Sequence, residues 1–139
     1  MFAINIKIHN IGGYIVKNYL LETSQGIIAI ATGYPGGTEK FISRFTKRWP
    51  LESLKYIFLT HHHDDHSGFL SDLLNVCDAK VILHPLAAQY LKDGKSNEPP
   101  GAGYSSRPAW MFSLIKKEFS FPPVDVTDRA IFIKSEKNQ

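Results

Sequence analysis

The sequence predicts an α/β fold, formed by a single domain over residues 1–139. From residue 54 onward, apolar runs typical of buried strands alternate with segments of helical periodicity, which favours a parallel sheet covered by helices. The first part of the chain instead holds three strand-like runs separated by short turns, which predicts an antiparallel start to the sheet. A chain of this length can bury roughly two thirds of its unfolded surface, enough for one core but not for two.

The N-terminal strands are predicted from side-chain alternation. In residues 2–8, Phe and Ile alternate with polar or small residues, so we expect a strand whose apolar side chains face the core. The runs YIVKNYLLET at 14–23 and IIAIA at 27–31 are rich in β-branched and aromatic residues. Because only the short segment 24–26 separates them, these two runs are expected to pair as antiparallel strands.

A loop rich in Gly and Pro at 33–37 precedes an amphipathic helix that Pro50 ends. Apolar side chains recur at helical spacing on one face of this helix. The other face is basic and carries Lys40, Arg44, Lys47 and Arg48. Such a face suits a nucleic acid or a phosphate group, but it also suits plain solvation near the helix C-terminus, which is the interpretation we favour.

The second part of the chain supplies the expected parallel strands and their helices. Buried strands are predicted at 54–60 and 80–84, and a last strand at 130–134. Helices are predicted at 69–74 and at 85–93, where Pro starts the second helix and Gly follows its end. A long loop at 94–108 then precedes an apolar stripe that we expect to pack on the domain's own core rather than on a membrane surface or a partner: Trp110, Met111, Leu114, Ile115 and Phe119.

Composition narrows the class of protein. The 16 basic and 13 acidic residues are interspersed and give a formal charge of +3, which is only a weak hint of an anionic partner. The lone Cys77 excludes an intrachain disulfide. Neither an apolar leader nor a run approaching the roughly 18 apolar residues of a membrane span is found, so we expect a cytoplasmic protein without a membrane partner.

The segment THHHDDHSG concentrates four of the six histidines of the chain between positions 61 and 66, together with two aspartates. Imidazole nitrogen and carboxylate oxygen are ligands of zinc and related metals, and a catalytic metal needs about three protein ligands and one position for water. In an extended segment His61 and His63 point the same way and can share one metal. Asp65 and His66 can face a second metal or support the first. A metal held in this way lowers the pKa of its bound water and makes hydroxide available.

Thr60, His61, His63, Asp65, His66 and Gly68 match the pattern T-H-x-H-x-D-H-x-G. The chain thereby resembles the metallo-β-lactamase superfamily of metal-dependent hydrolases. The runs GGYIVKNYLLET, IIAIATG and GYPGG look like the opening β-meander of that family, and KVILHP looks like its following strand. The resemblance implies a metallo-β-lactamase-like αββα sandwich, truncated to roughly its N-terminal half.

The resemblance also implies roles for individual residues. His61 and His63 would bind a first metal, while Asp65 and His66 would bind a second. Asp65 would also act catalytically, by accepting a proton from the attacking water. We expect one or two Zn²⁺ ions, although Mn²⁺ or Fe²⁺ suit the same ligands, and a small-molecule substrate whose type the resemblance does not specify.

The chain departs from the family pattern in two respects. The family completes its site with ligands from the second half of the domain, whereas the only histidine here after position 66 is His84, which we expect not to be a ligand. Asp125 and Asp128 are interpreted as turn residues, and His9 as a structural or exposed residue. At Ala31 the family usually has an aspartate that helps to hold the ligand loop.

Two hypotheses follow. The first is a zinc-dependent hydrolase, and the second is a truncated, catalytically impaired metal-binding or structural homo-oligomer derived from the same family. A homo-oligomer is expected because half of a sandwich leaves an apolar sheet face and strand edges exposed. A nucleic-acid partner would rest on the basic helix alone and is not expected.

Overall fold

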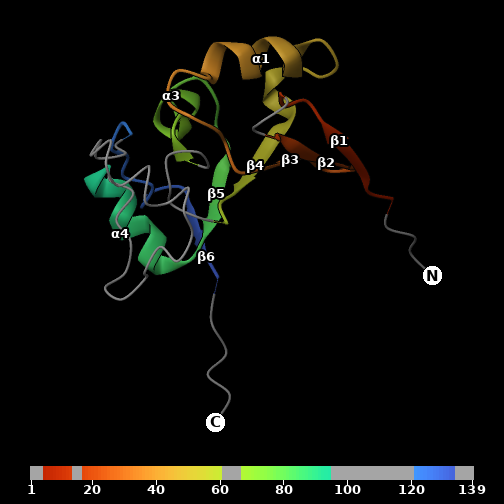
Figure 1. Ribbon diagram of the computed structural model, residues 1–139. Coiled ribbons are helices and arrows are strands. Elements are labelled where there is room, and N and C mark those ends of the chain that lie inside the picture. Colours follow the sequence, from red (N-terminus) through yellow and green to blue (C-terminus); the bar gives the residue numbers. More distant parts are fainter. Residues whose placement is uncertain (1–4, 14–16, 61–66, 95–120, 134–139) are drawn as a thin grey trace, which may run out of the picture.

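The computed structural model describes residues 5–13, 17–60, 67–94 and 121–133 and contains one six-stranded sheet, whose strands are ordered in space as in the sequence (Figure 1). The first three strands pair antiparallel, and every pair from β3 to β6 is parallel. The antiparallel start and the parallel continuation predicted from the sequence are both confirmed. The strands are β1 (Lys7–Asn10), β2 (Tyr19–Thr23), β3 (Gly26–Ile30), β4 (Leu54–Phe58), β5 (Lys80–Leu83) and β6 (Ala130–Phe132).

Three helices lie on one side of this sheet (Figure 1). They are α1 (Thr38–Thr46), α3 (Leu70–Leu74) and α4 (Pro85–Asp93), with a short 3₁₀ turn, η1 (Leu51–Ser53), before β4. The predicted ends of α4 are confirmed, because Pro85 begins the helix and Gly94 closes it with a φ of 66°. A Cβ at Gly94 would collide with the carbonyl oxygen of Phe121, so glycine is required there. Within the described part of the chain, no helix is long and apolar enough to cross a bilayer.

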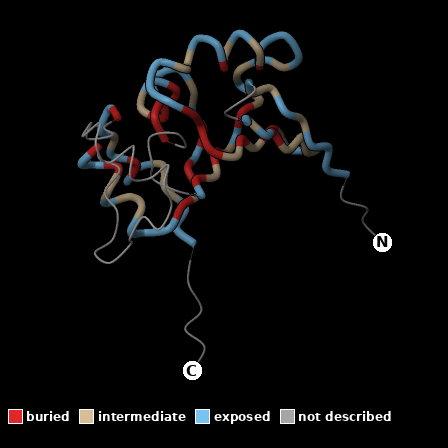
Figure 2. Tube along the Cα trace, in the orientation of Figure 1, coloured by how far each residue is buried: buried red, intermediate tan, exposed pale blue. Residues whose placement is uncertain are grey.

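The core lies between the helices and the sheet face that they cover (Figure 2). Phe41 and Phe45 are four residues apart on α1 and therefore face the same way, with their ring centroids 5.9 Å apart. Each fully buried side chain of this size contributes about 1.5–3 kcal/mol to stability. Sheet and helices contribute together to this layer: Leu20, Ile27, Ala29, Ile57, Val81 and Leu83 from the strands, and Phe41, Phe45, Leu70, Leu73 and Leu91 from the helices.

The opposite face of the sheet is largely apolar, and its side chains range from half-buried to exposed. The prediction that the isoleucines of the first strand face the core is wrong, since Ile6 is 50% exposed and Ile8 is 70% exposed. The reason is the register: His9 pairs with the buried Leu20, so the helix-covered face takes His9 and leaves Ile8 on the uncovered side. We call this uncovered side the open face. By register this face also carries Asn10 and Lys80, and its apolar side chains are Ile8, Tyr19, Leu21, Ile28, Ile30, Tyr56, Phe58, Ile82 and Ile131.

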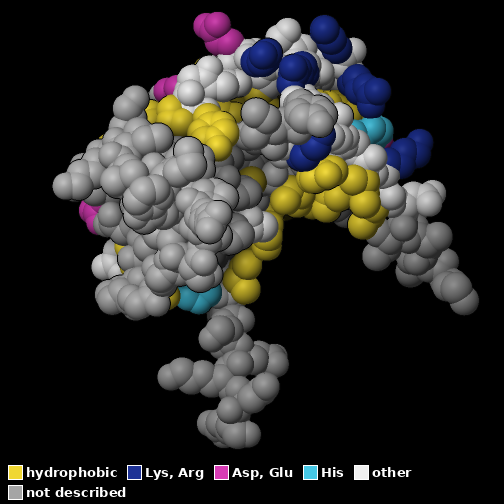
Figure 3. All heavy atoms as spheres, in the orientation of Figure 1, with side chains coloured by type: hydrophobic (Ala, Val, Ile, Leu, Met, Phe, Trp, Pro, Cys, Tyr) yellow, Lys and Arg dark blue, Asp and Glu magenta, His cyan; other side chains and the backbone are white. Residues whose placement is uncertain are grey.

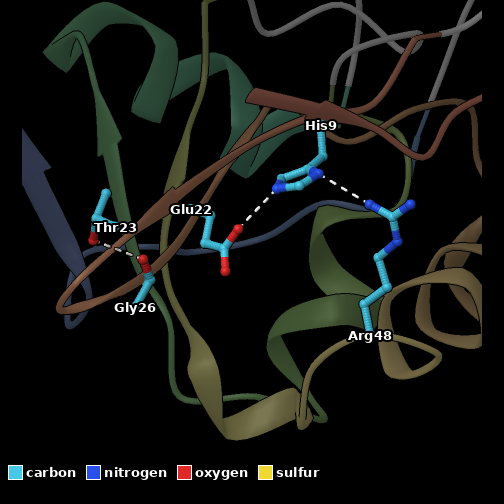
Figure 4. A network of polar contacts seen from close by, with 5 residues as sticks. All are labelled: His9, Glu22, Thr23, Gly26 and Arg48. Atoms are coloured by element: carbon cyan, nitrogen blue, oxygen red, sulfur yellow. Dashed lines mark hydrogen bonds and ion pairs between the residues drawn. The ribbon is translucent and has the colours of Figure 1, made fainter. Parts of the chain in front are cut away.

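His9 joins the first hairpin to the end of α1 (Figure 4). Its Nε2 donates to Glu22 Oε2 over 2.8 Å, and its Nδ1 accepts from Arg48 Nη1 over 2.9 Å. Only the neutral tautomer with the proton on Nε2 satisfies both partners. The hydrogen bond from His9 lowers the pKa of the Glu22 carboxyl. His9 is therefore a structural residue, as expected from the sequence.

Candidate metal centre

The predicted ligands His61, His63, Asp65 and His66 lie outside the described residues, but the structure describes the chain on both sides of them. Thr60 follows the end of β4, and Ser67 leads into α3. Strand β4 is the centre of the parallel part of the sheet, between β3 and β5. The segment is thus attached at the carboxyl edge of parallel strands, where open α/β sheets bind their ligands.

Backbone hydrogen bonds hold the strand ends together at this edge. Ala31 N, just past β3, donates to the carbonyl of Phe58 over 2.7 Å. Leu59 N, just past β4, donates to the carbonyl of Ile82 over 2.9 Å. Because these bonds lie at the last residues of the strands, they fix where the His- and Asp-rich segment leaves the sheet.

The same edge holds buried polar residues. In the part of the chain that the structure describes, the buried polar residues are Thr32 and Ser67, each 1% exposed. Asn18 Nδ2 donates to the carbonyl of Thr32 over 2.7 Å and ties the start of β2 to the end of β3. Burying a polar group costs free energy unless it has a partner, so such polar contacts are needed at this edge of the sheet.

Ala31 combines burial with an unfavourable backbone conformation. It is 5% exposed and has a φ of 64°, the only positive φ of a non-glycine residue among the described ranges. The left-handed region costs an L-residue about 1–2 kcal/mol, and Asn and Asp tolerate it better than Ala does. The aspartate that the family resemblance places at this position would therefore suit the backbone conformation as well as the ligand loop.

The other candidate residues have structural roles. His84 precedes α4, and its Nδ1 accepts from Leu86 N over 3.1 Å, which caps the helix. Asp125 Oδ1 accepts from Thr127 N over 3.0 Å, and hydrogen bonds from Thr127 lower the pKa of the Asp125 carboxyl. Asp128 also lies in this turn. The described residues contain no group of three His, Cys, Asp or Glu side chains that could hold a metal.

Cys77 is a poor metal ligand in its present environment. Burial raises the pKa of its thiol, whereas metals bind the thiolate. Arg129 Nη1 donates to the backbone carbonyl of Cys77 over 2.7 Å, so a side chain from the segment before β6 holds this part of the chain. The candidate metal chemistry therefore rests on histidine and carboxylate donors.

A cavity of about 520 Å³ opens beside the carboxyl edge. We call it the loop–helix cavity, since the Gly-rich loop and α1 form most of its wall. This cavity was not predicted from the sequence. Its only signal in the sequence was a side-chain-poor loop directly before a basic helix. Its lining residues are Gly13, Asn18, residues 33–37, Lys40, Phe41, Arg44 and Phe69.

Replacing Ala31 with glycine should stabilise the protein. Glycine removes the left-handed penalty but adds unfolded-state entropy, so Ala31→Gly is expected to raise the free energy of unfolding by about 0.5–1 kcal/mol. The matched control is Ala29→Gly in β3, where the same change should lower stability by about 1–2 kcal/mol. Urea denaturation measures both values, and a loss of stability in both variants would contradict the proposed strain at Ala31.

The sequence of the chain is similar to the metallo-beta-lactamase superfamily and to known proteins. The family model of the metallo-beta-lactamase superfamily matches residues 11–134. The chain is 27% identical over 78 residues to the alpha subunit of 2,4-dinitroanisole O-demethylase from a Nocardioides species. It is 48% identical over 52 residues to a metallo-beta-lactamase fold-containing protein from Sulfurisphaera tokodaii. These alignments cover 55% and 34% of the present chain, but only 24% and 20% of the two relatives.

Solved structures are similar over most of the chain. A metallo-beta-lactamase with a HARLDQ motif from Cronobacter sakazakii superposes with a TM-score of 0.71 at 22% identity. A subclass B3 metallo-beta-lactamase from Bradyrhizobium japonicum superposes with a TM-score of 0.68 at 25% identity. The matches cover 92% and 94% of the present chain, but 43% and 44% of the two structures. The chain therefore spans less than half the length of these proteins.

Proposed function

The chain belongs to the metallo-beta-lactamase superfamily, and from this premise we propose that it is a metal-dependent hydrolase of a small-molecule substrate. The predicted fold class, a truncated metallo-β-lactamase-like domain, is confirmed. Nearly the whole chain superposes on metallo-beta-lactamase structures, but it covers less than half of each of them. The assignment of residues 1–139 to one partial domain stays a prediction. The observation that carries the proposal is the place of the His- and Asp-rich segment, which joins the end of β4 to the buried start of α3.

The donor set fits a divalent metal. His61, His63 and His66 offer imidazole nitrogens and Asp65 offers a carboxylate, the ligand types of catalytic zinc sites. We propose that His61 and His63 hold one ion and that Asp65 and His66 hold a second. A bound metal would supply Lewis acidity and an activated water for hydrolysis. Asp65 would accept the proton that this water loses.

The substrate is left open by the comparisons. One relative is named as an O-demethylase of 2,4-dinitroanisole, and the structural neighbours are named as beta-lactamases. The chain covers 24% of the demethylase subunit and 44% of the Bradyrhizobium enzyme. The activities of these whole proteins therefore do not transfer to the present chain, and we propose only the reaction class.

Elemental analysis tests the metal assignment. Protein purified without chelator should contain about one metal ion per chain or more, because three histidines and a carboxylate exceed the number of ligands that one catalytic ion needs. The double variant His61→Ala, His63→Ala should lose the ion that these two residues hold, so its metal content per chain should fall.

The control is His84→Ala, which removes a helix cap but no proposed ligand and should keep the metal. Equal metal content in the double variant and the wild type would contradict the assignment. Metal binding without turnover of ester, lactam or lactone probes would favour the second hypothesis, an impaired metal-binding oligomer.

The open face supports self-association. It runs across the sheet from β1 to β6, and Figure 3 shows hydrophobic side chains gathered in one region beside the basic residues. Ile8 is 70% exposed, Tyr19 44% and Ile131 41%. Contiguous apolar patches larger than a few hundred Å² usually mark an interface. We propose that a second copy of this chain covers the open face.

Light scattering coupled to size-exclusion chromatography tests this proposal. The wild type should elute as a dimer or larger species, and Ile8→Lys should shift it toward the monomer, because a charge buried in an apolar interface is strongly unfavourable. Val76→Lys is the matched control, since Val76 is 52% exposed but lies outside the open face. A monomeric wild type over a wide concentration range would refute the proposal.

A further inference from the structure

We propose that the loop–helix cavity binds the anionic group, a carboxylate or phosphate, of a small-molecule substrate. This inference rests on the proposed function, because it assigns a substrate class to the same hydrolase. Three observations support it: the basic side chains that line the cavity, the residues that form its wall, and its location beside the carboxyl edge of the sheet.

The charges that line the cavity have one sign. Lys40 and Arg44 lie one turn apart on α1 and both line it, while none of its described lining residues is acidic. Lys40 is exposed and makes no hydrogen bond or ion pair within the described ranges. Arg44 Nη1 donates to the carbonyl of Ile11 over 3.0 Å, which anchors the side chain and leaves further N–H donors of the guanidinium for a ligand.

Part of the cavity wall is glycine backbone, beside the side chains of Tyr34 and Pro35. Gly33, Gly36 and Gly37 carry no side chains that could fill the space. Gly37 lies so close to Phe69 that a Cβ would come within 2.9 Å of its ring. The floor is apolar, because Phe41 is 4% exposed and Phe69 is 3% exposed. A volume of about 520 Å³ with an apolar floor and a few polar groups is typical of a small-molecule site.

The cavity borders the carboxyl edge of the sheet. Gly33 directly follows the buried Thr32, and Phe69 stands two residues after the buried Ser67. An anionic group held by Lys40 and Arg44 therefore leaves the remainder of the same molecule at the edge where the metal-ligand segment is attached. In this arrangement the cavity orients the substrate and the segment carries the chemistry.

The distribution of basic residues argues against a nucleic-acid surface. Figure 3 shows Lys and Arg side chains spread over the α1 side of the molecule, yet of the described basic residues only Lys40 and Arg44 line the cavity. Arg48 is directed to His9 Nδ1, and Lys47 lies outside the cavity. A concave site with two convergent charges fits one small anionic group better than it fits a polymer backbone.

The test is an NMR titration of the purified, metal-containing protein with inorganic phosphate and, separately, with sodium acetate. Saturable shifts are expected for the amides of Gly33, Gly36 and Gly37. Lys40→Gln should weaken binding about fivefold, because it removes one charge-assisted contact. Lys47→Gln, which removes one charge from the same helix outside the cavity, should change it less than about twofold.

Tighter binding of phosphate or of acetate identifies which group the site prefers, and either supports the proposal. No saturable shift with either anion would overturn it, as would equal weakening in Lys40→Gln and Lys47→Gln. Oligonucleotide binding that both variants weaken equally would likewise replace the site with a diffuse nucleic-acid surface.

Metal content, measured on the same samples, separates the two proposals. Binding that depends on Lys40 in protein without metal would uphold the cavity and refute the proposed hydrolase. Binding that is lost in His61→Ala, His63→Ala but unchanged in Lys40→Gln would place the anion on the metal and refute the cavity.

Discussion

The parallel pairing of β3, β4 and β5 is the constraint on which the rest of the molecule depends. Parallel strands need crossover connections, and α1 and α3 supply them on a single side of the sheet. The carboxyl ends of the three strands consequently meet at one edge, where backbone bonds from Ala31 and Leu59 hold them in register. The fold thereby brings its polar segments to one place while its apolar helix faces fill the core.

The features at this edge depend on one another. The backbone strain at Ala31, the burial of Thr32 and Ser67 and the loop–helix cavity all lie where a strand ends or the next helix begins. Strained conformations persist only where the surrounding structure determines them, and they cluster at functional sites. On the other side of the sheet, the described strands instead carry exposed isoleucines, Ile8 and Ile131, which are part of the surface that we propose a second copy covers.

The order and type of the elements could be predicted from the sequence because each was signalled locally. Pro85 and Gly94 determined the ends of α4, and the spacing of Phe41 and Phe45 determined the buried face of α1. The orientation of β1 could not be predicted in this way. Alternation shows that one face is apolar, but only the register with β2 shows that His9 rather than Ile8 faces the helices. In a sheet that helices cover on one side only, an apolar side chain can therefore lie on the exposed side, as Ile8 does.

The candidate site could be predicted only in part for a similar reason. Donor chemistry and spacing predict His61, His63, Asp65 and His66 as ligands, because ligand types are a property of the sequence, and this stays a prediction since the four residues lie outside the described ranges. The positive φ of Ala31 and the convergence of Lys40 and Arg44 on one cavity are properties of the tertiary structure. No local pattern encodes them, since they arise from contacts between segments distant in the chain.

X-ray absorption spectroscopy at the zinc edge of the zinc-loaded protein tests the central claim most directly, namely that the histidine and aspartate segment binds the metal. If the segment holds the metal, we expect nitrogen and oxygen ligands at about 2.0–2.1 Å together with the outer-shell scattering of at least two imidazoles. A sulfur ligand at about 2.3 Å would place the metal at Cys77, and the absence of imidazole scattering would show that the segment does not hold it. Either of these results would contradict metal binding by the histidine and aspartate segment.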